Sequence, residues 1–247
     1  MKLQIFLLLT CISCIYCQDK GYCDPDLCTD SWGNVSPHIG CPGVAKDECP
    51  SDARWIPIEK ELRSIVLDKH NSYRNQLAAG KLAGFPAAKK MPTIEWDDEL
   101  AYLAYLNVMQ CVFEHDECHN TYQFKWAGQN LGWSGGYSSD KQAVQTNVDG
   151  WWAEHKNATE SDIHEVGDSK YMIGHFTAMA QDRTNRIGCA GSVYNGKERL
   201  VACNYSFTNL QGSPVYESGK AASGCKTGTN SKYPSLCSTK EEVDPNP

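Results

Sequence analysis

The chain has 247 residues and a formal net charge of −7, with 30 acidic against 23 basic side chains. An acidic chain without a basic stripe argues against nucleic acid and anionic membranes as electrostatic partners. The length suffices for one core of ordinary size, and no fixed-period repeat or long linker demands a second domain.

Residues 1–17 have the features of a signal peptide. Lys2 precedes an apolar run from Leu3 to Ile15, which is too short to span a bilayer. Cleavage would leave Gln18 as the first mature residue. No later segment is apolar for long enough to cross a membrane, so the sequence predicts a secreted, extracellular protein without a transmembrane segment.

Ten cysteines follow the signal peptide, and this even number in an oxidising compartment favours five disulfides. The first four lie in an arm, residues 18–56, that is rich in Pro, Gly and Asp and has no sustained helical or strand period. Such an arm cannot bury much apolar surface, so we expect disulfides to attach it to the rest of the chain.

Three helices are expected after the arm. Over residues 57–79 apolar side chains recur every three or four positions, between Pro57 at a favourable first position and a stop at Gly80. A second helix begins after Asp97, which can cap it and is followed by two more acidic residues. A third covers about residues 140–155.

After residue 170 the period of apolar residues changes to two. In "GHFTAMAQD" (174–182) alternate residues fall on opposite sides, which predicts a strand. The stretch at 186–207 predicts a β-hairpin, because its Asn-Gly pair at 195–196 is a strong turn signal between arms rich in β-formers.

Within this hairpin, Cys189 and Cys203 lie equally far from the turn, so a disulfide across the two strands is geometrically natural. Helices first and strands later, without alternation, favour an α+β fold in which helices cover an antiparallel sheet.

"HDECH" at 115–119 places two histidines four residues apart, as zinc proteases do. That motif requires H-E-x-x-H on a helix, with the glutamate beside the first histidine as general base. Here Asp116 takes that position and Glu117 falls one residue late, so the motif is broken. The local sequence instead favours His119 as a surface residue and His115 as a packed or hydrogen-bonded one.

Four blocks together resemble the CAP superfamily, which comprises the cysteine-rich secretory, antigen 5 and pathogenesis-related 1 proteins. They are "HNSYRNQL" (70–77), "GQNLGW" (128–133), "GHFTAMAQDRTNRIGCA" (174–190) and "LVACNYSFTNLQG" (200–212). The arm and the tail are similar, more narrowly, to dipteran antigen 5 proteins. The resemblance implies a disulfide-stapled αβα sandwich, with one antiparallel sheet between helical layers. Its domain would cover residues 57–212, followed by a tail, 213–247, with one disulfide loop.

The resemblance also implies a central cleft formed by His115, Gln129, Glu154 and His175. Neutral imidazoles from two separate elements can bind a divalent ion such as zinc, so His115 and His175 are candidate metal ligands, although no cofactor is required. Gln129 departs from the acid usual at its position, and an amide is a neutral, weaker ligand. In the alternative interpretation the two histidines bond to each other, to Glu154 and to water while packing the sheet against a helix.

The disulfide pairing implied by the resemblance attaches the arm to the second helix and the loop beyond it. The pairs are Cys23–Cys41, Cys28–Cys118, Cys49–Cys111, Cys189–Cys203 and Cys225–Cys237.

Three N-x-[ST] sequons occur. Asn34 and Asn157 lie in polar, loop-like surroundings and are expected to carry sugar, whereas Asn204 lies inside an apolar strand pattern. Five aromatic residues are expected near the cleft, most of them as ordinary core: Trp126, Trp133, Tyr137, Trp151 and Trp152.

The resemblance implies a monomeric, secreted, non-enzymatic protein of saliva or haemolymph. Its partners would be small apolar ligands, such as lipids, sterols or fatty acids, or host proteins of haemostasis and immunity. The alternative function is a metal-dependent extracellular hydrolase that uses His115, His175 and Glu154. A serine nucleophile has no support, because no G-x-S-x-G elbow is present, and no R-G-D or K-G-D tripeptide supports integrin binding.

Overall fold

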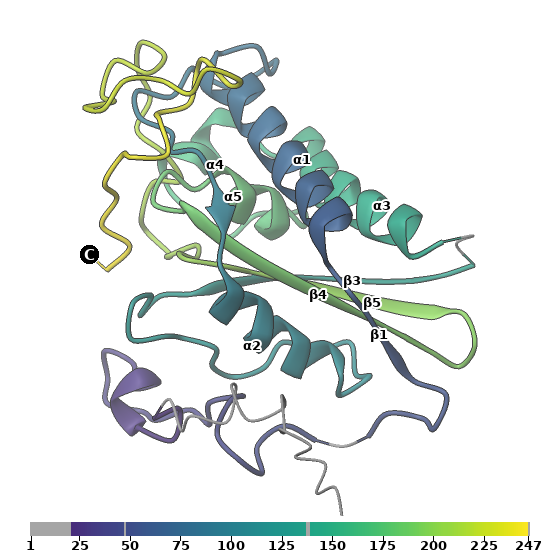
Figure 1. Cartoon of the computed structure of the whole chain (residues 1–247). Coiled ribbons are helices and arrows are strands. Elements are labelled where there is room, and N and C mark those ends of the chain that lie inside the picture. The colour runs from purple at the N-terminus through teal and green to yellow at the C-terminus, as the bar shows by residue number, and fades with distance from the viewer. Residues whose placement is uncertain (1–20, 47, 137–138, 247) are drawn as a thin grey trace, which may run out of the picture.

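The computed structural model describes residues 21–46, 48–136 and 139–246 (Figure 1). The expected signal peptide, Gln18 and Tyr137 lie outside the described residues. The strands are β1 (Arg54–Ile56), β2 (Glu95–Trp96), β3 (Gly128–Gly135), β4 (Arg186–Tyr194) and β5 (Glu198–Tyr205). The helices are α1 (Lys60–Ala78), α2 (Asp98–Val108), α3 (Asp140–Ala153), α4 (Glu160–His164) and α5 (Gly174–Ala180), with short 3-10 turns η2 (Pro25–Leu27) and η3 (Glu154–Asn157).

The strands form one sheet in the order β1-β4-β5-β3, in which all neighbours are antiparallel. The expected hairpin is confirmed: β4 and β5 pair around a turn in which Asn195 and Gly196 have φ angles of 49° and 71°. The two-residue strand β2 differs from the expectation of a purely antiparallel sheet, because it pairs with β4 in parallel.

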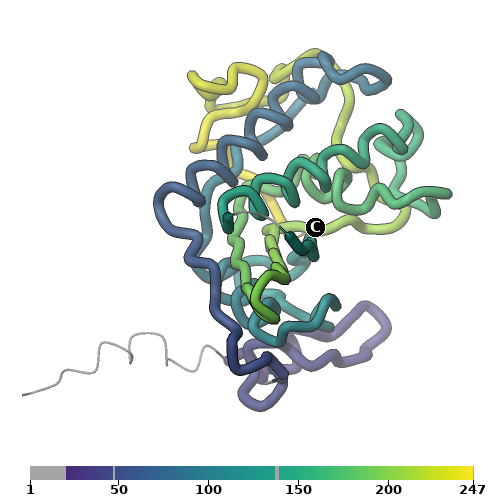
Figure 2. The backbone as a smooth tube through the Cα atoms, turned by 90° about the vertical axis from the view of Figure 1, so that its right-hand side faces the viewer, coloured from purple at the N-terminus to yellow at the C-terminus, as the bar shows by residue number. Residues whose placement is uncertain are grey.

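Helices cover both faces of this sheet. Helix α2 packs on one face, against β4 and β5, while α1, α3 and α5 lie on the other (Figure 1). The views in Figures 1 and 2 agree that the arm runs along the α2 side and that most of the tail lies at the opposite end of the molecule. The end of the tail returns to the loop after α2, where Asn246 bonds to Gln123 and Lys125. The arrangement is the αβα sandwich that the resemblance implied.

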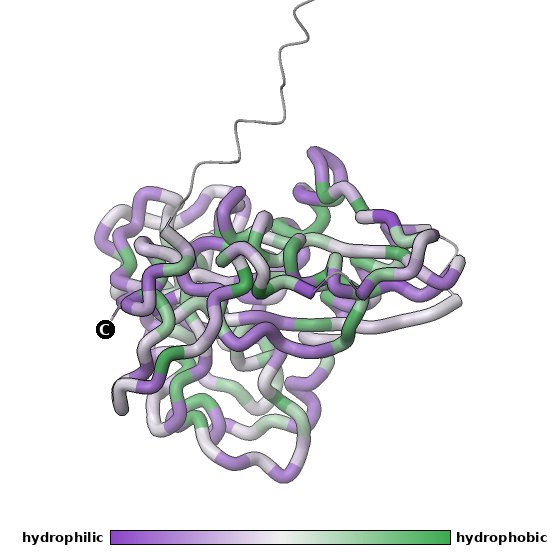
Figure 3. Tube along the Cα trace, turned by 90° about the horizontal axis from the view of Figure 1, so that it is seen from below, coloured by the Kyte–Doolittle hydropathy of each residue, from purple (hydrophilic) through white to green (hydrophobic). Residues whose placement is uncertain are grey.

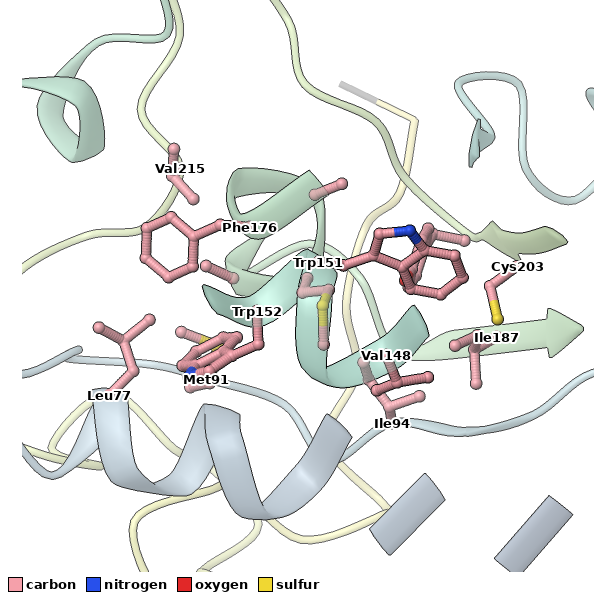
Figure 4. Packing of buried hydrophobic residues seen from close by; sticks show 14 of the residues in the cluster. Leu77, Met91, Ile94, Val148, Trp151, Trp152, Phe176, Ile187, Cys203 and Val215 are labelled. Atoms are coloured by element: carbon pink, nitrogen blue, oxygen red, sulfur yellow. The ribbon is translucent and has the colours of Figure 1, made fainter. Parts of the chain in front are cut away.

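The main core lies between the sheet and the layer of α1, α3 and α5 (Figure 4). Trp152 is its centre: its ring stacks on Tyr73 of α1 with centroids 5.0 Å apart and meets Phe176 of α5 edge-on at 5.1 Å. Such aromatic pairs add about 0.5–1.5 kcal/mol each to the gain from burial. Packing around one indole therefore holds three helices together.

A fully buried arginine adds a polar link to this layer. Arg74 of α1 donates to the carbonyl oxygens of Pro92, Met179, Gln181 and Thr184, at 2.7–3.0 Å. Burial lowers the pKa of its guanidinium to about 9. The four carbonyls satisfy both terminal nitrogens of a group that would otherwise be very costly to bury, while its Nε has no hydrogen-bond partner among the described residues. They connect α1 to the end of α5, to the turn after it and to the segment before β2.

The three expected helices are present, with Asp97 capping α2 through the N–H groups of Glu99 and Leu100. The predicted strand at 174–182 is wrong, because most of it forms helix α5. Phe176, Met179 and Ala180 are spaced three and four apart and all are buried, so helical packing overrides the alternation that suggested a strand. Strands β1 and β3 had not been expected.

The structure contains the five disulfides that the resemblance implied: Cys23–Cys41, Cys28–Cys118, Cys49–Cys111, Cys189–Cys203 and Cys225–Cys237. Hydrophobic positions are interspersed with hydrophilic ones along the described chain (Figure 3), and none of its helices has the length and apolar character needed to cross a bilayer.

Candidate functional site

The first histidine of the cleft, His115, lies in the loop after α2 and is exposed. Its Nδ1 atom is 2.8 Å from Oε1 of Gln129, the second residue of β3. Gln129 therefore contacts His115 directly, in the position where the resemblance implied an acid.

The hydrogen bonds of Gln129 determine which way its amide faces. Its nitrogen donates to the Asp116 carboxylate at 2.8 Å and to the Asn204 side-chain oxygen at 3.0 Å. Because Asp116 and Asn204 both offer acceptors, the amide nitrogen of Gln129 faces them and its oxygen faces His115. Because an amide oxygen can only accept, Nδ1 of His115 is the donor in this hydrogen bond, which leaves Nε2 as the ring nitrogen available to a metal ion.

The second histidine, His175, is the second residue of α5 rather than part of a strand. Its Nδ1 atom is 2.6 Å from Oε1 of Glu154, and the other carboxylate oxygen accepts the backbone N–H groups of His175 and Phe176 at 3.0 and 3.3 Å. Glu154 thus caps the start of α5 and orients the imidazole at the same time.

The two histidines are connected to consecutive residues of β3, which is an edge strand of the described sheet. His115 bonds to Gln129, and the carbonyl of His175 accepts from the Asn130 side chain at 3.1 Å. Consecutive side chains of a strand point to opposite faces, so the chain segments that carry the two histidines approach the same edge of the sheet from its two faces.

The "HDECH" stretch is organised differently from the expectation. His119 is buried, not at the surface as predicted, and bonds to the nearly buried Asp116 carboxylate at 2.5 Å. His115 is exposed but hydrogen-bonded to Gln129, which agrees with one of its two predicted alternatives. Burial disfavours the charges of both His119 and Asp116, but their mutual attraction outweighs it. The pKa of His119 is raised, and the pKa of Asp116 is lowered to about 2.

Each of the two histidines has the hydrogen bonding of a metal ligand, and no contact between the two imidazoles is present among the described residues. A metal-binding histidine usually donates its other ring N–H to an oxygen that orients it. Both Nδ1 atoms have such a partner, Gln129 for His115 and Glu154 for His175. The two Nε2 atoms are the ones that an ion such as zinc would bind, with water at the remaining positions.

One group of three potential ligands in the described chain lies within reach of a single ion but does not qualify. Cys28, His38 and Cys118 have ligand atoms within 4.8 Å of one another. Cys28 and Cys118 are joined in a disulfide, however, which leaves no thiolate for a metal.

A separate apolar groove lies at the opposite edge of the sheet. Its volume is about 610 Å³, and it is bounded by β1, β2, the start of α1 and the exposed side of α2. Cys189 and Ala190 of β4 line the groove between β1 and β2. Four aromatic side chains line it as well: Trp55, Trp96, Tyr102 and Tyr105. This groove had not been predicted, because no local motif marks it.

Comparison with known proteins decides the family. Residues 67–205 match the model of the CAP, cysteine-rich secretory protein family. This chain belongs to the CAP family. It is 38% identical to "Venom allergen-1" of Aedes albopictus over 97% of this chain and 95% of that protein. It is 44% identical to "Antigen 5 like allergen Cul n 1" of Culicoides nubeculosus over 80% of this chain and 93% of that protein.

A solved CAP structure supports the same fold. "Crystal structure of NaASP2 with Zn2+" superposes with a TM-score of 0.65 at 27% identity, covering 76% of this chain and 99% of that one. The CAP match begins within α1 and ends with β5, and it includes all four residues expected to form the cleft.

The other candidate positions of this CAP chain have distinct environments. Asn34 and Asn157 are exposed, whereas Asn204 is fully buried and bonded to Gln129. Of the aromatic residues expected near the cleft, Trp151 stacks beside His175 with centroids 6.0 Å apart, and Trp152 belongs to the core. Trp133 is 51% and Trp126 36% exposed.

Proposed function

We propose that this CAP protein is a secreted, non-enzymatic protein of the antigen 5 type that binds a small apolar ligand in the groove beside β1. The observation that carries the proposal is the groove itself. Its volume of about 610 Å³ falls within the range of small-molecule sites, about 300–1,000 Å³. Trp55 is 53% exposed at its rim, an arrangement typical of a binding surface rather than of a core.

Secretion is supported by the five disulfides, since such bonds persist in oxidising compartments. The allergen names of the dipteran relatives agree with release from the cell. The expected glycosylation of Asn34 and Asn157 also belongs to this proposal, and both asparagines are exposed. Saliva or haemolymph would be the compartment, and a lipid, sterol or fatty acid the ligand; a host protein is the other proposed partner.

The alternative function, a metal-dependent hydrolase, has weaker support. Both oxygens of Glu154 are engaged, one by the ring of His175 and the other by backbone N–H groups, so this carboxylate is poorly placed to act as a general base. Every described cysteine is in a disulfide, which removes a thiol nucleophile. We therefore propose a binding role and not a catalytic one.

Divalent-ion binding by His115 and His175 is a second proposed property, favoured by their two free Nε2 atoms. Zinc titration by calorimetry tests it. We expect His115→Ala and His175→Ala each to weaken binding at least about tenfold, since each removes one of two protein ligands. His164→Ala, at an exposed histidine of α4, is the control. Unchanged binding in both cleft variants would refute the site.

Ligand binding in the groove is tested with Nile red, an uncharged dye that fluoresces in apolar surroundings. We expect Trp55→Ala to weaken its binding by about tenfold, since contact with an indole contributes on the order of 1.5–3 kcal/mol. Trp133→Ala is the matched control, because Trp133 is exposed to a similar extent but lies on β3, at the other edge of the sheet. Equal binding by both variants would contradict the proposal.

A further inference from the structure

The floor of the groove is a gap in the sheet. Along its outer edge, β4 pairs with β2 at residues 186–187 and with β1 at 191–193. Residues 188–190 have no strand beside them on that edge. Directly after Ile56 the chain leaves the sheet through Pro57 to enter α1, so β1 does not continue along these residues.

The register shows which backbone groups face this gap. Cys189 and Cys203 are directly opposite, with Cα atoms 4.1 Å apart. This short separation is typical of a pair that shares no backbone hydrogen bonds, about 4.5 Å against about 5.5 Å for a bonded pair. The N–H and C=O of Cys189 therefore point away from β5, toward the gap.

Hydrogen bonds of neighbouring residues agree with this assignment. The carbonyls of Asn185 and Ile187 accept from Glu95 and Asp97 on the outer edge, at 3.0 and 2.9 Å, while the carbonyl of Arg186 accepts from Ser206 on the β5 side. Odd-numbered residues of β4 thus face outward. Among the hydrogen bonds between described residues outside the regular ladders, none involves the N–H or C=O of Cys189.

The rim of the groove carries few charged side chains, and some of them are already paired with an opposite charge. Arg63 donates to Asp98 at 3.1 Å and stacks over Trp96 at 4.7 Å, so its cation is already engaged. Glu59 is exposed at the start of α1 and makes no ion pair with another described residue. The charge left at the rim is therefore negative, which disfavours an anionic ligand.

We infer that the groove binds a small amphiphile with an apolar body and an uncharged head group that both donates and accepts a hydrogen bond, such as an alcohol or a primary amide. The inference rests on the proposed function and specifies its ligand. The head group accepts from the N–H of Cys189 and donates to its C=O. The apolar body lies along Trp55 and Tyr105, whose rings meet edge to face with centroids 6.0 Å apart on the wall of the groove.

A ligand with a charged head group would pair less well with the backbone groups of Cys189. A carboxylate cannot donate to the C=O of Cys189, and it meets the charge of Glu59; an ammonium group cannot accept from the N–H. An unpaired buried polar group is costly. The gap also excludes a long peptide strand, because it spans only residues 188–190, about 10 Å, and is closed at its ends by β1 and β2.

The first test compares four ligands with alkyl chains of equal length that end in an alcohol, a primary amide, a carboxylate or an ammonium group. Each displaces Nile red from the intact protein. We expect the alcohol or the amide to bind at least about tenfold more tightly than either charged ligand. In Glu59→Gln, carboxylate binding should improve while amide binding stays constant. Tighter binding of the carboxylate or the ammonium ligand would overturn the inference.

The second test observes the backbone directly. In ¹⁵N-labelled protein, the amide proton of Cys189 should shift downfield and exchange more slowly when the alkyl amide binds. The amide of Ala190 is the internal control, because it faces β5 and is already paired. An unchanged Cys189 signal in the complex would refute the inference while leaving the proposed function intact. Failure of Nile red and of all four ligands to bind would refute the proposed function itself.

Discussion

Gln129 has a larger role than that of a missing acid. Its oxygen accepts from His115, and its nitrogen donates to Asp116 and Asn204. A glutamate could accept from the histidine but could not donate to the other two. The buried Asp116 carboxylate therefore requires a hydrogen-bond donor beside it, which the Gln129 amide supplies and a glutamate would not.

The substitution Gln129→Glu tests this pairing. It would place a second carboxylate against Asp116 and remove two hydrogen bonds, so we expect a loss of about 2–3 kcal/mol in the free energy of unfolding at neutral pH. Urea denaturation measures it. Gln211→Glu, at an exposed position in the loop after β5, is the control. A Gln129→Glu variant as stable as the wild type would show that the amide donors contribute nothing.

The His119–Asp116 pair predicts a pH dependence. Because the pKa of His119 is raised in the folded state, its stabilisation is complete below the ordinary histidine pKa of about 6.5 and is lost as the pH rises through the raised value. Because the pKa of Asp116 is lowered to about 2, its contribution is lost as the pH falls from about 4 toward that value. Urea denaturation should show that the difference in stability between the wild type and His119→Gln shrinks as the pH rises above neutrality. The control variant His164→Gln should have the same stability as the wild type throughout. A difference for His119→Gln that stays constant with pH would contradict the pairing.

At the scale of elements, α5 depends on a side chain from outside it. The N-cap residue of α5, Ile173, has an apolar side chain that cannot accept a hydrogen bond. Glu154 instead accepts hydrogen bonds from two backbone N–H groups in the first turn of α5. The negative carboxylate also suits the positive end of the helix. This contact joins the end of α3 to the element that carries His175.

Glu154→Ala should therefore lower the free energy of unfolding by about 2–3 kcal/mol, because it leaves partly buried donors without their charged acceptor. Chemical denaturation monitored by circular dichroism provides the measurement. Glu165→Ala, at an exposed position just after α4, should have little effect. If the two variants lose the same stability, Glu154 does not hold α5 in place.

The elements differ in how far their sequences predict them. Helices α1 to α3 and the β4–β5 hairpin have strong local signals, a sustained period with Asp97 as cap or an Asn195-Gly196 turn. Over residues 174–180 the apolar side chains fit both the two-residue period of a strand and the three- and four-residue spacing of a helix. The hydrogen bonds to Glu154, which cap a helix at this position, are what distinguishes the two. The cleft residues came from resemblance to a family. The groove depends on the register of β4, which no local pattern contains.

At the scale of the whole molecule, disulfides attach the arm to the α2 side of the sandwich. Cys28–Cys118 spans 90 residues of sequence, but with Cys49–Cys111 closed the loop that it adds is only about thirty residues. The packing beneath the arm is modest, a cluster of Tyr22, Leu27 and Ile39 against Leu103. Covalent attachment thus replaces a large interface.

The double variant Cys28→Ser/Cys118→Ser should lose about 3–4 kcal/mol of stability in the chain-entropy model. Its arm should also be cleaved faster by a protease under native conditions. The comparison is Cys225→Ser/Cys237→Ser, which opens a loop in the tail, far from the arm. The prediction fails if arm cleavage is as slow without the Cys28–Cys118 bridge as with it.

The crossed arrangement of these bridges has a consequence for survival among extracellular proteases. Every position between Cys23 and Cys49 is enclosed by at least one disulfide that reaches past it along the chain. A single nick there severs the polypeptide without releasing a fragment, since both new ends stay covalently tethered. A protein cleaved once in this segment would therefore keep all its parts together until a reductant broke the disulfides.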